Sequence, residues 1–237
     1  VMAEPLHPSS SAPDVLVVGA GVVGASAAWH LARRGCRVTV VDRACTFGAG
    51  STSRATGGFR AQFASEVNVR LSLVAREQLL SLEADTGVDP GYRPVGYLFL
   101  ASSAEQLAAL AGARAIQRAA GFDGAREVTV DEAARINPAV SLESVAGGVF
   151  CATDGTIRPM EILRGYAEGA RRMGVRFVFG ASDLAFDVRD GRVEVVRTRD
   201  ERFTPAAVVN AAGAWAAQVA RLAGVELAVA PVRRQVA

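Results

Sequence analysis

An apolar run at residues 15–18 leads directly into a glycine-rich turn, and this junction constrains the fold more than any other part of the chain. The glycines follow the spacing Gly19-x-Gly21-x-x-Gly24, and a helical stretch at 22–34 comes next. The first glycine of such a turn permits a tight strand-to-helix connection, the second lets a phosphate approach bare backbone, and the third lets the helix pack closely on the strand. The pattern therefore predicts a β-α-β unit that binds a dinucleotide.

A carboxylate stands at the end of the next predicted strand, 37–41. This residue, Asp42, lies 18 residues beyond Gly24, close to the spacing of about 20 residues at which an acid accepts hydrogen bonds from a ribose. We expect the phosphates of the cofactor at the helix N-terminus, where unpaired N–H groups and the macrodipole favour negative charge. The motif by itself does not distinguish NAD from FAD.

Composition excludes several other classes of protein. The 237 residues are half apolar, enough for a full core in one large or two small domains. All 26 basic residues are arginines scattered among acids, with a net charge of +2, so no nucleic-acid stripe is indicated. The three cysteines have neither metal-site nor disulfide-framework spacing. Residues 1–13 predict a disordered leader without a secretory signal, no apolar run is long enough to span a membrane, and a cytoplasmic location is the default.

Periodicity and turn residues outline the remaining elements. A Gly/Ser/Thr-rich loop at 46–60 is of the irregular kind that often carries function. We expect a hairpin of 184–189 with 192–198 across Asp190-Gly191, and Pro159 at the first position of a helix. The expected helices are 65–86, 104–120, 131–136, 160–173 and 214–222; the expected strands are 97–101, 147–151, 175–179 and an apolar strand from Ala207 that enters a second glycine turn at Gly213.

The order of these elements predicts an α/β fold, α+β overall, in which a Rossmann-like domain is interrupted by a partial antiparallel-sheet domain. We place the first domain at 14–90 and 153–224, and the inserted domain at 91–152 and 225–237. Residues 226–237 are strand-like and stop without a turn or cap, which would leave a sheet edge exposed. On this ground we expect the chain to be a fragment or a truncated product.

Four motifs together carry a resemblance to a known family. They are Gly19-x-Gly21-x-x-Gly24, Asp42-Arg43, Gly50-Ser-Thr-Ser-Arg-Ala-Thr-Gly-Gly-Phe-Arg-Ala-Gln-Phe63 and Val209-Asn-Ala-Ala-Gly-Ala-Trp215. In this order and approximate spacing the chain, from Asp14 to its last residue, resembles the FAD-dependent amine and amino-acid oxidoreductases of the D-amino-acid oxidase superfamily. The resemblance is to the branch with sarcosine oxidase, glycine oxidase and dimethylglycine dehydrogenase, and it implies that the inserted domain is a substrate domain.

The resemblance implies that the cofactor is FAD and that the loop at 51–58 lies along the flavin. The expected cofactor contacts, beyond the three motif glycines and Asp42, are Arg43, Ser51, Thr52, Ser53, Arg54, Gly57, Gly58, Ala212 and Gly213. Two plainer interpretations stay open: the loop as an ordinary surface loop, and the second turn as an ordinary connection with Trp215 as core packing. Because residues 51–58 hold no histidine of the kind that links to flavin in the related dehydrogenases, we expect non-covalent FAD.

Arg60 matches an arginine that clamps the substrate carboxylate in sarcosine oxidase. A guanidinium binds a carboxylate through two parallel hydrogen bonds, which supplies both charge and orientation. The alternative is a surface or helix-capping arginine. Gln62 is a second candidate on the same face, whereas Gly57 stands where sarcosine oxidase has a further arginine near the flavin, so that contact is lost.

These features predict an enzyme that oxidises the C–N bond of a small amine or N-substituted amino acid by hydride transfer to FAD. Neither a catalytic dyad nor a metal site is evident, and the choice between oxidase and dehydrogenase stays open. We expect a small-molecule substrate and neither nucleic acid nor membrane as partner. Two alternatives are a non-catalytic flavin-binding protein, since Gly57 to Phe63 looks like a string in a respiratory-complex assembly factor, and an NAD-dependent dehydrogenase.

Overall fold

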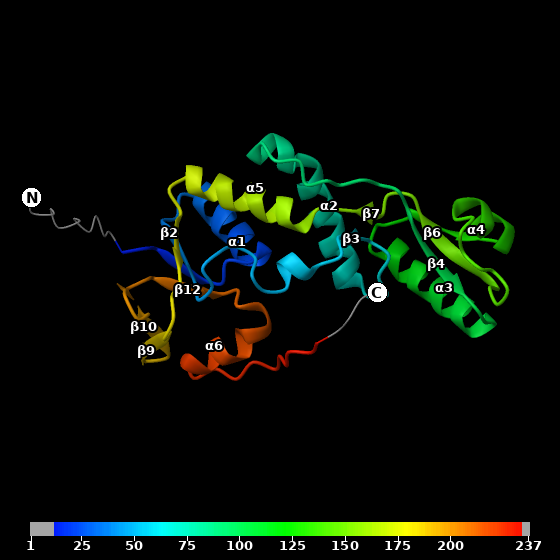
Figure 1. The fold of residues 1–237 in the computed structure, drawn as a ribbon. Helices are drawn as coiled ribbons and strands as arrows, with labels where there is room; N and C mark the ends of the chain where they lie inside the picture. The colour runs from blue at the N-terminus through cyan, green and yellow to red at the C-terminus, as the bar shows by residue number, and fades with distance from the viewer. Residues whose placement is uncertain (1–11, 234–237) are drawn as a thin grey trace, which may run out of the picture. The chain divides into compact units, whose positions relative to one another are not determined.

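The computed structural model describes residues 12–233, and these form two compact units. Residues 12–55 and 162–233 belong to the first unit, and residues 56–161 to the second. Figure 1 labels many of the elements of both. Of the predicted leader, residues 1–11 lie outside the described part of the chain.

A parallel sheet is the centre of the first unit. Its order is β12-β1-β2-β8, with bounds β1 (Val15–Val18), β2 (Val38–Asp42), β8 (Arg176–Phe179) and β12 (Ala207–Asn210). All four residues of β1 are buried, as a strand paired on both sides and covered on both faces requires. Because the strands are parallel, their carboxyl ends meet at one edge, where ligands bind in open α/β sheets.

Helices and a small antiparallel sheet accompany this parallel sheet. The helical elements are α1 (Val22–Arg33), η1 (Thr52–Arg54), α5 (Pro159–Arg172, which begins in the second unit), η2 (Gly213–Trp215) and α6 (Ala216–Leu222); the antiparallel strands are β9 (Ala185–Arg189), β10 (Arg192–Arg197) and β11 (Arg202–Phe203). Asp190 and Gly191 both have positive φ, 52° and 72°, as a two-residue type I′ turn demands. The predicted hairpin and the helix beginning at Pro159 are thus confirmed.

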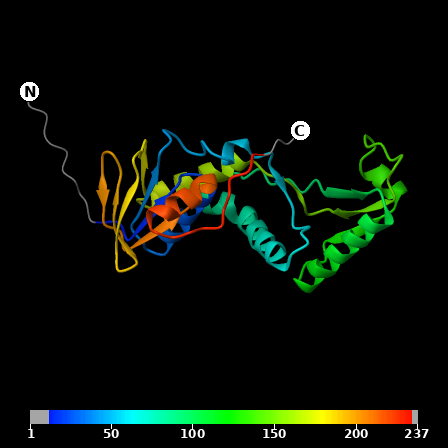
Figure 2. The same cartoon turned by 90° about the horizontal axis from the view of Figure 1, so that it is seen from below.

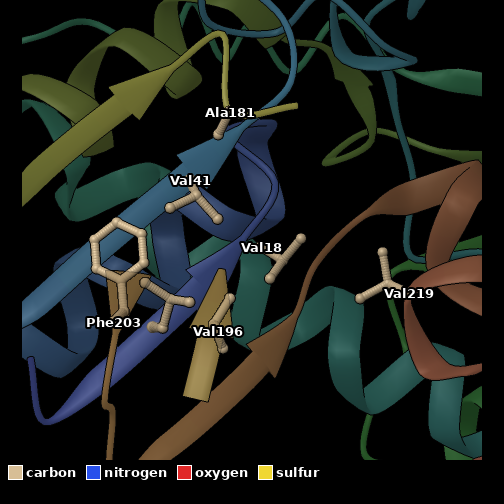
Figure 3. Packing of buried hydrophobic residues seen from close by; sticks show 7 residues of the cluster. Val18, Val41, Ala181, Val196, Phe203 and Val219 are labelled. Atoms are coloured by element: carbon tan, nitrogen blue, oxygen red, sulfur yellow. The ribbon is translucent and has the colours of Figure 1, made fainter. Parts of the chain in front are cut away.

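The core of the first unit joins the two sheets. Val18 and Val41 of the parallel sheet cluster with Val196 of β10 and Phe203 of β11, and Val219 of α6 completes the cluster (Figure 3). Each fully buried side chain of this size contributes about 1.5–3 kcal/mol relative to exposure. The antiparallel sheet is therefore anchored against the strands that carry the glycine turn.

The second unit contains an antiparallel sheet of order β4-β6-β5 and a two-stranded ribbon, β3-β7. The bounds are β3 (Gly58–Phe59), α2 (Glu66–Thr86), β4 (Tyr97–Ala101), α3 (Ala104–Ala119), β5 (Ala125–Val128), α4 (Val130–Ile136), β6 (Gly147–Cys151) and β7 (Gly155–Thr156). The helix α3 lies along the three-stranded sheet, as Figure 2 shows. A buried cluster including Val69, Phe122 and Val149 joins α2 to this sheet.

Three features differ from the sequence-based expectations. Helix α2 belongs to the second unit rather than to the unit of the glycine turn, because Val69 and Leu73 pack in the cluster with Phe122 and Val149. Strand β5 was not predicted. The strand expected at 226–237 is wrong within the described residues, since 226–233 have no strand partner; 234–237 lie outside them. The functional division into a cofactor and a substrate domain stays a prediction.

Candidate functional site

Two of the motif glycines are required by backbone contacts within the first unit. Gly19 has φ +113°, and a Cβ there would overlap the carbonyl oxygen of Ala211 in the turn after β12. A Cβ at Gly24 would overlap the carbonyl oxygen of Gly19. The first glycine therefore lets the two glycine turns touch, and the third lets α1 approach the end of β1.

Gly21 differs from both of its neighbours in the motif, because no backbone atom lies against its Cβ side. A Cβ at this position would meet only the Thr52 hydroxyl, at 3.3 Å. Gly21 is also the N-cap of α1 and provides no side-chain cap, and the first turn of α1 holds no acidic residue. Thr52 reaches this end of the helix from its loop, where its Oγ1 accepts a hydrogen bond from Val22 N–H at 3.2 Å. The helix N-terminus thus carries neither an acidic side chain nor a Cβ at its N-cap, which favours an anion at the N–H groups that Thr52 does not cap.

The carboxylate of Asp42 lies beside the same turn. Its Oδ2 accepts a hydrogen bond from the backbone N–H of Ala20 at 2.7 Å, and its Oδ1 accepts one from Ala44 N–H at 2.8 Å. Each carboxylate oxygen can accept a further hydrogen bond. The acid predicted for the ribose is thus fixed next to the glycine turn with acceptor capacity left.

The turn after β12 forms the other side of this sheet edge. Asn210 holds it: its side chain donates to the carbonyl of Ala216 at 2.8 Å and accepts from Ala212 N–H at 3.2 Å. Trp215 follows and is 38% exposed, so the interpretation of this residue as buried core is wrong. The guanidinium of Arg43 lies 4.0 Å from the centroid of its indole ring, a cation–π contact.

Other predicted loop residues have mainly local partners. Arg54 donates to the carbonyls of Ala49 and Gly50, and the Ser53 hydroxyl contacts the Gly50 carbonyl at 3.5 Å; Ser51 is the N-cap of η1. Within the second unit, Gly57 has φ +80°, and a Cβ there would overlap the Ile157 carbonyl. This close contact with Ile157, next to β7, explains in steric terms why residue 57 is a glycine.

Arg60, in the second unit, is surrounded by aromatic rings. Its guanidinium carbon lies 4.7 Å from the centroid of Phe63, 5.4 Å from that of Phe99 and 5.9 Å from that of Tyr97. Within residues 12–233, no carboxylate pairs with this half-buried arginine. Ring faces hold a guanidinium through its charge while leaving its N–H fork available. The sequence motif identified Arg60 but gave no signal for Tyr97 and Phe99 as its neighbours.

Gln62 is 5% exposed and is directed into the second unit. Its amide nitrogen donates at 3.1 Å both to the carbonyl of Tyr97 and to the carboxylate of Asp154. The structure thus brings Gln62 next to a fully buried acid that was not among the predicted site residues. The signal available in the sequence was weak, since Asp-Gly pairs are common in turns.

The remaining chemistry-bearing side chains have structural roles. The ring of His30 packs edge-on against Trp29 at 4.6 Å, and His7 lies outside the described residues. Cys151 is buried, and this burial raises the pKa of its thiol. Across residues 12–233 no group of three or more metal-ligating side chains occurs. A search of the same residues finds no helix with the length and apolarity needed to span a membrane.

A Rossmann-like sheet, a glycine turn that exposes helix N–H groups and an acid beside it define a dinucleotide-binding protein. The comparison with protein families specifies the class: residues 14–237 match the DAO family, FAD dependent oxidoreductase. The chain belongs to this family, and FAD is accordingly the dinucleotide.

Individual relatives agree with this assignment. FAD-dependent oxidoreductase domain-containing protein 1 of Bos taurus is 33% identical, over 93% of this chain and 52% of that protein. Glycine oxidase of Geobacillus kaustophilus is 31% identical, over 93% of this chain and 59% of the oxidase. The crystal structure of L-proline dehydrogenase from P. horikoshii superposes with a TM-score of 0.83 at 30% identity, covering 90% of this chain and 56% of that one. The chain thus spans about half the length of these relatives.

Proposed function

We propose that the first unit binds FAD non-covalently at the edge where β1, β2 and β12 end. The observation that carries this proposal is the contrast among the three glycines. Backbone carbonyl oxygens occupy the Cβ side of Gly19 and Gly24, whereas Gly21, at the N-terminus of α1, has only the Thr52 hydroxyl on that side. The fit extends to Asp42, whose fixed carboxylate retains acceptor capacity for ribose hydroxyls. Arg43, Thr52 and the Ala212–Gly213 backbone border the same edge.

We infer that the activity supported by this chain is oxidation of the C–N bond of a small amine or N-substituted amino acid. FAD, when bound, supplies the hydride acceptor. The contribution of the second unit is to hold the substrate: the Arg60 guanidinium binds the carboxylate through its N–H fork. The buried Gln62 amide donates to Tyr97 and Asp154 instead and supports the segment that carries Arg60. Support comes from the aromatic surroundings of Arg60 and from the names of two relatives, glycine oxidase and L-proline dehydrogenase. The cytoplasmic location, and the absence of nucleic-acid and membrane partners, stay predictions.

The test uses the purified 237-residue chain with added FAD. We expect saturable binding, detected as quenching of flavin fluorescence, and release of free flavin into the supernatant after heat denaturation. Flavin that stays with the precipitated protein would contradict non-covalent binding. Absence of saturable FAD binding would contradict the cofactor site itself.

The reaction is tested by anaerobic addition of glycine, sarcosine or L-proline to the FAD-loaded chain. Loss of the visible flavin absorbance with at least one of them supports C–N oxidation, and Arg60→Ala should weaken this response. Flavin that binds but is never reduced by any of these compounds favours the alternative of a non-catalytic flavin-binding protein.

A further inference from the structure

The segment at residues 60–63 is held in the second unit by an unusual set of buried polar groups. Asp154, in the connection between β6 and β7, is 0% exposed. Its Oδ1 accepts a hydrogen bond from the backbone N–H of Ala61 at 2.9 Å, and its Oδ2 accepts one from the Gln62 side-chain amide at 3.1 Å. The carboxylate thus holds two successive residues immediately after Arg60.

The other end of the segment is held from α3. Gln117, 3% exposed, donates its side-chain amide to the carbonyl of Phe63 at 3.2 Å. Phe63 is in turn one of the rings beneath the Arg60 guanidinium. Gln117 and Asp154 therefore fix the chain on both sides of Arg60.

The same network reaches the two remaining rings around Arg60. Gln62 donates to the carbonyl of Tyr97 at 3.1 Å, and Tyr97 and Phe99 project from the same face of β4, since residues two apart on a strand share a face. Their ring centroids lie 5.1 Å apart. A single set of hydrogen bonds thus fixes the arginine segment relative to the strand that provides its aromatic neighbours.

Both glutamines of this network are only partly satisfied. Their side-chain oxygens, Gln62 Oε1 and Gln117 Oε1, are the two buried side-chain polar atoms without a hydrogen-bond partner in the described part of the chain. Turning the Gln62 amide over does not help, because its nitrogen already faces two acceptors. Unsatisfied buried polar groups lower stability and are rare. One of these two lies in the 60–63 segment and the other contacts it from α3, so their coincidence points to a function of that segment.

We propose that Asp154 and Gln117 are positioning residues that fix the orientation of the Arg60 guanidinium. The role extends the proposed function, since it rests on Arg60 as the residue that binds the substrate carboxylate. Neither residue contacts the substrate in this account. They act through the 60–63 segment.

The test follows the Arg60 Nε–Hε resonance by ¹H–¹⁵N NMR of the 237-residue chain, assigned by its loss in Arg60→Ala. In the unaltered chain the aromatic rings should displace this signal from those of exposed arginines. Asp154→Asn replaces one carboxylate oxygen by an NH₂ group, so either the Ala61 N–H or the Gln62 amide loses its acceptor. Gln117→Leu removes the hydrogen bond to the Phe63 carbonyl together with the unsatisfied Gln117 oxygen. In both variants we expect the Arg60 signal to move towards the exposed arginines.

Asp123→Asn is the matched control. Asp123 lies in the same unit and pairs with Arg118 on the surface, so this change should shift the Arg118 signal and leave that of Arg60 in place. An Arg60 signal that does not move in the folded Asp154→Asn and Gln117→Leu proteins overturns the proposal. Should neither variant fold, hydrogen exchange of the unaltered chain decides: the Ala61 amide must exchange as slowly as the amides of β6, and fast exchange overturns the proposal.

A titration with sarcosine separates the proposal from the function it rests on. Sarcosine should shift the Arg60 signal of the unaltered chain, and its affinity should fall about tenfold, equivalent to about 1.4 kcal/mol, in Asp154→Asn. If sarcosine does not shift the Arg60 signal of the unaltered chain, Arg60 does not bind the substrate. The positioning of Arg60 by Asp154 and Gln117 is not affected by that result. A shift with equal affinity in Asp154→Asn and the unaltered chain overturns the positioning role alone.

Discussion

Replacing each of two motif glycines by alanine should separate the fold from cofactor binding. In Gly24→Ala the new methyl group overlaps the carbonyl oxygen of Gly19, and neither backbone can yield without displacing α1 from β1. Overpacking of this kind costs about 1–3 kcal/mol. For a chain of this length we therefore expect the melting temperature to fall by about 2–12 °C, at about 2–4 °C for each kcal/mol.

In Gly21→Ala the methyl group meets only the Thr52 hydroxyl at 3.3 Å, and the backbone, at φ −77° and ψ −178°, suits alanine. The weaker N-cap preference of alanine is offset by about 0.4–1 kcal/mol from the reduced freedom of the unfolded chain. Stability should therefore change by less than about 1 kcal/mol. The same methyl group holds the phosphates of FAD away from the helix N–H groups, and losing one charge-assisted hydrogen bond, about 1.5–3 kcal/mol, weakens FAD binding about 10- to 150-fold.

The assays are thermal unfolding by circular dichroism without cofactor and FAD titration by flavin fluorescence. We expect a larger fall in melting temperature for Gly24→Ala than for Gly21→Ala. In Gly21→Ala the FAD affinity should fall while the melting temperature changes by less than about 4 °C. An equal loss of stability in both variants would refute the steric assignment. Unaltered FAD affinity in Gly21→Ala would refute the assignment of the phosphate site.

Three further predictions follow from named contacts. Arg60→Ala should raise KM for carboxylate-bearing amines by the equivalent of about 2–3 kcal/mol; steady-state kinetics with unchanged KM would contradict the role of Arg60. Burial raises the pKa of the Cys151 thiol, so iodoacetamide followed by mass spectrometry should label exposed Cys45 well before Cys151, and equal labelling would contradict the packing around β6. Hydrogen bonds from Arg37 lower the pKa of Asp14, so the stability that this ion pair contributes is fully present above the ordinary carboxyl pKa and is lost as the pH falls through the lowered pKa. When the melting temperature is measured against pH, Asp14→Asn should therefore reduce its fall at acid pH. An unchanged fall would contradict the contribution of the Asp14–Arg37 pair.

The sequence predicted the cofactor half of the fold well because each signal there was local. The run at 15–18, the glycine spacing and the Asp190-Gly191 turn each determine backbone geometry within a few residues. Strand β5 was missed because only the two end residues of Ala125–Val128 are buried. Its sequence therefore lacks the alternation of apolar and polar residues that indicates a strand. Residues 226–233 show the converse: alternating Val and Leu predict a strand, yet a strand also needs a neighbour to hydrogen-bond.

The candidate site was predictable to the extent that its residues act through motifs. Gly21, Asp42 and Arg60 were found from spacing or resemblance. Asp154 was not, because its importance comes from the burial of its carboxylate beneath Ala61, 93 residues away in sequence. Core packing of Trp215 was left open as an alternative, because its contact with Arg43 depends on how the two strand ends meet.

The most direct test of the central claim is the choice of dinucleotide. The purified 237-residue chain is titrated with FAD, and NADH is then added as a competitor. We expect saturable FAD binding that NADH does not reverse and that Gly21→Ala weakens. Saturable NADH binding with no affinity for FAD would contradict it.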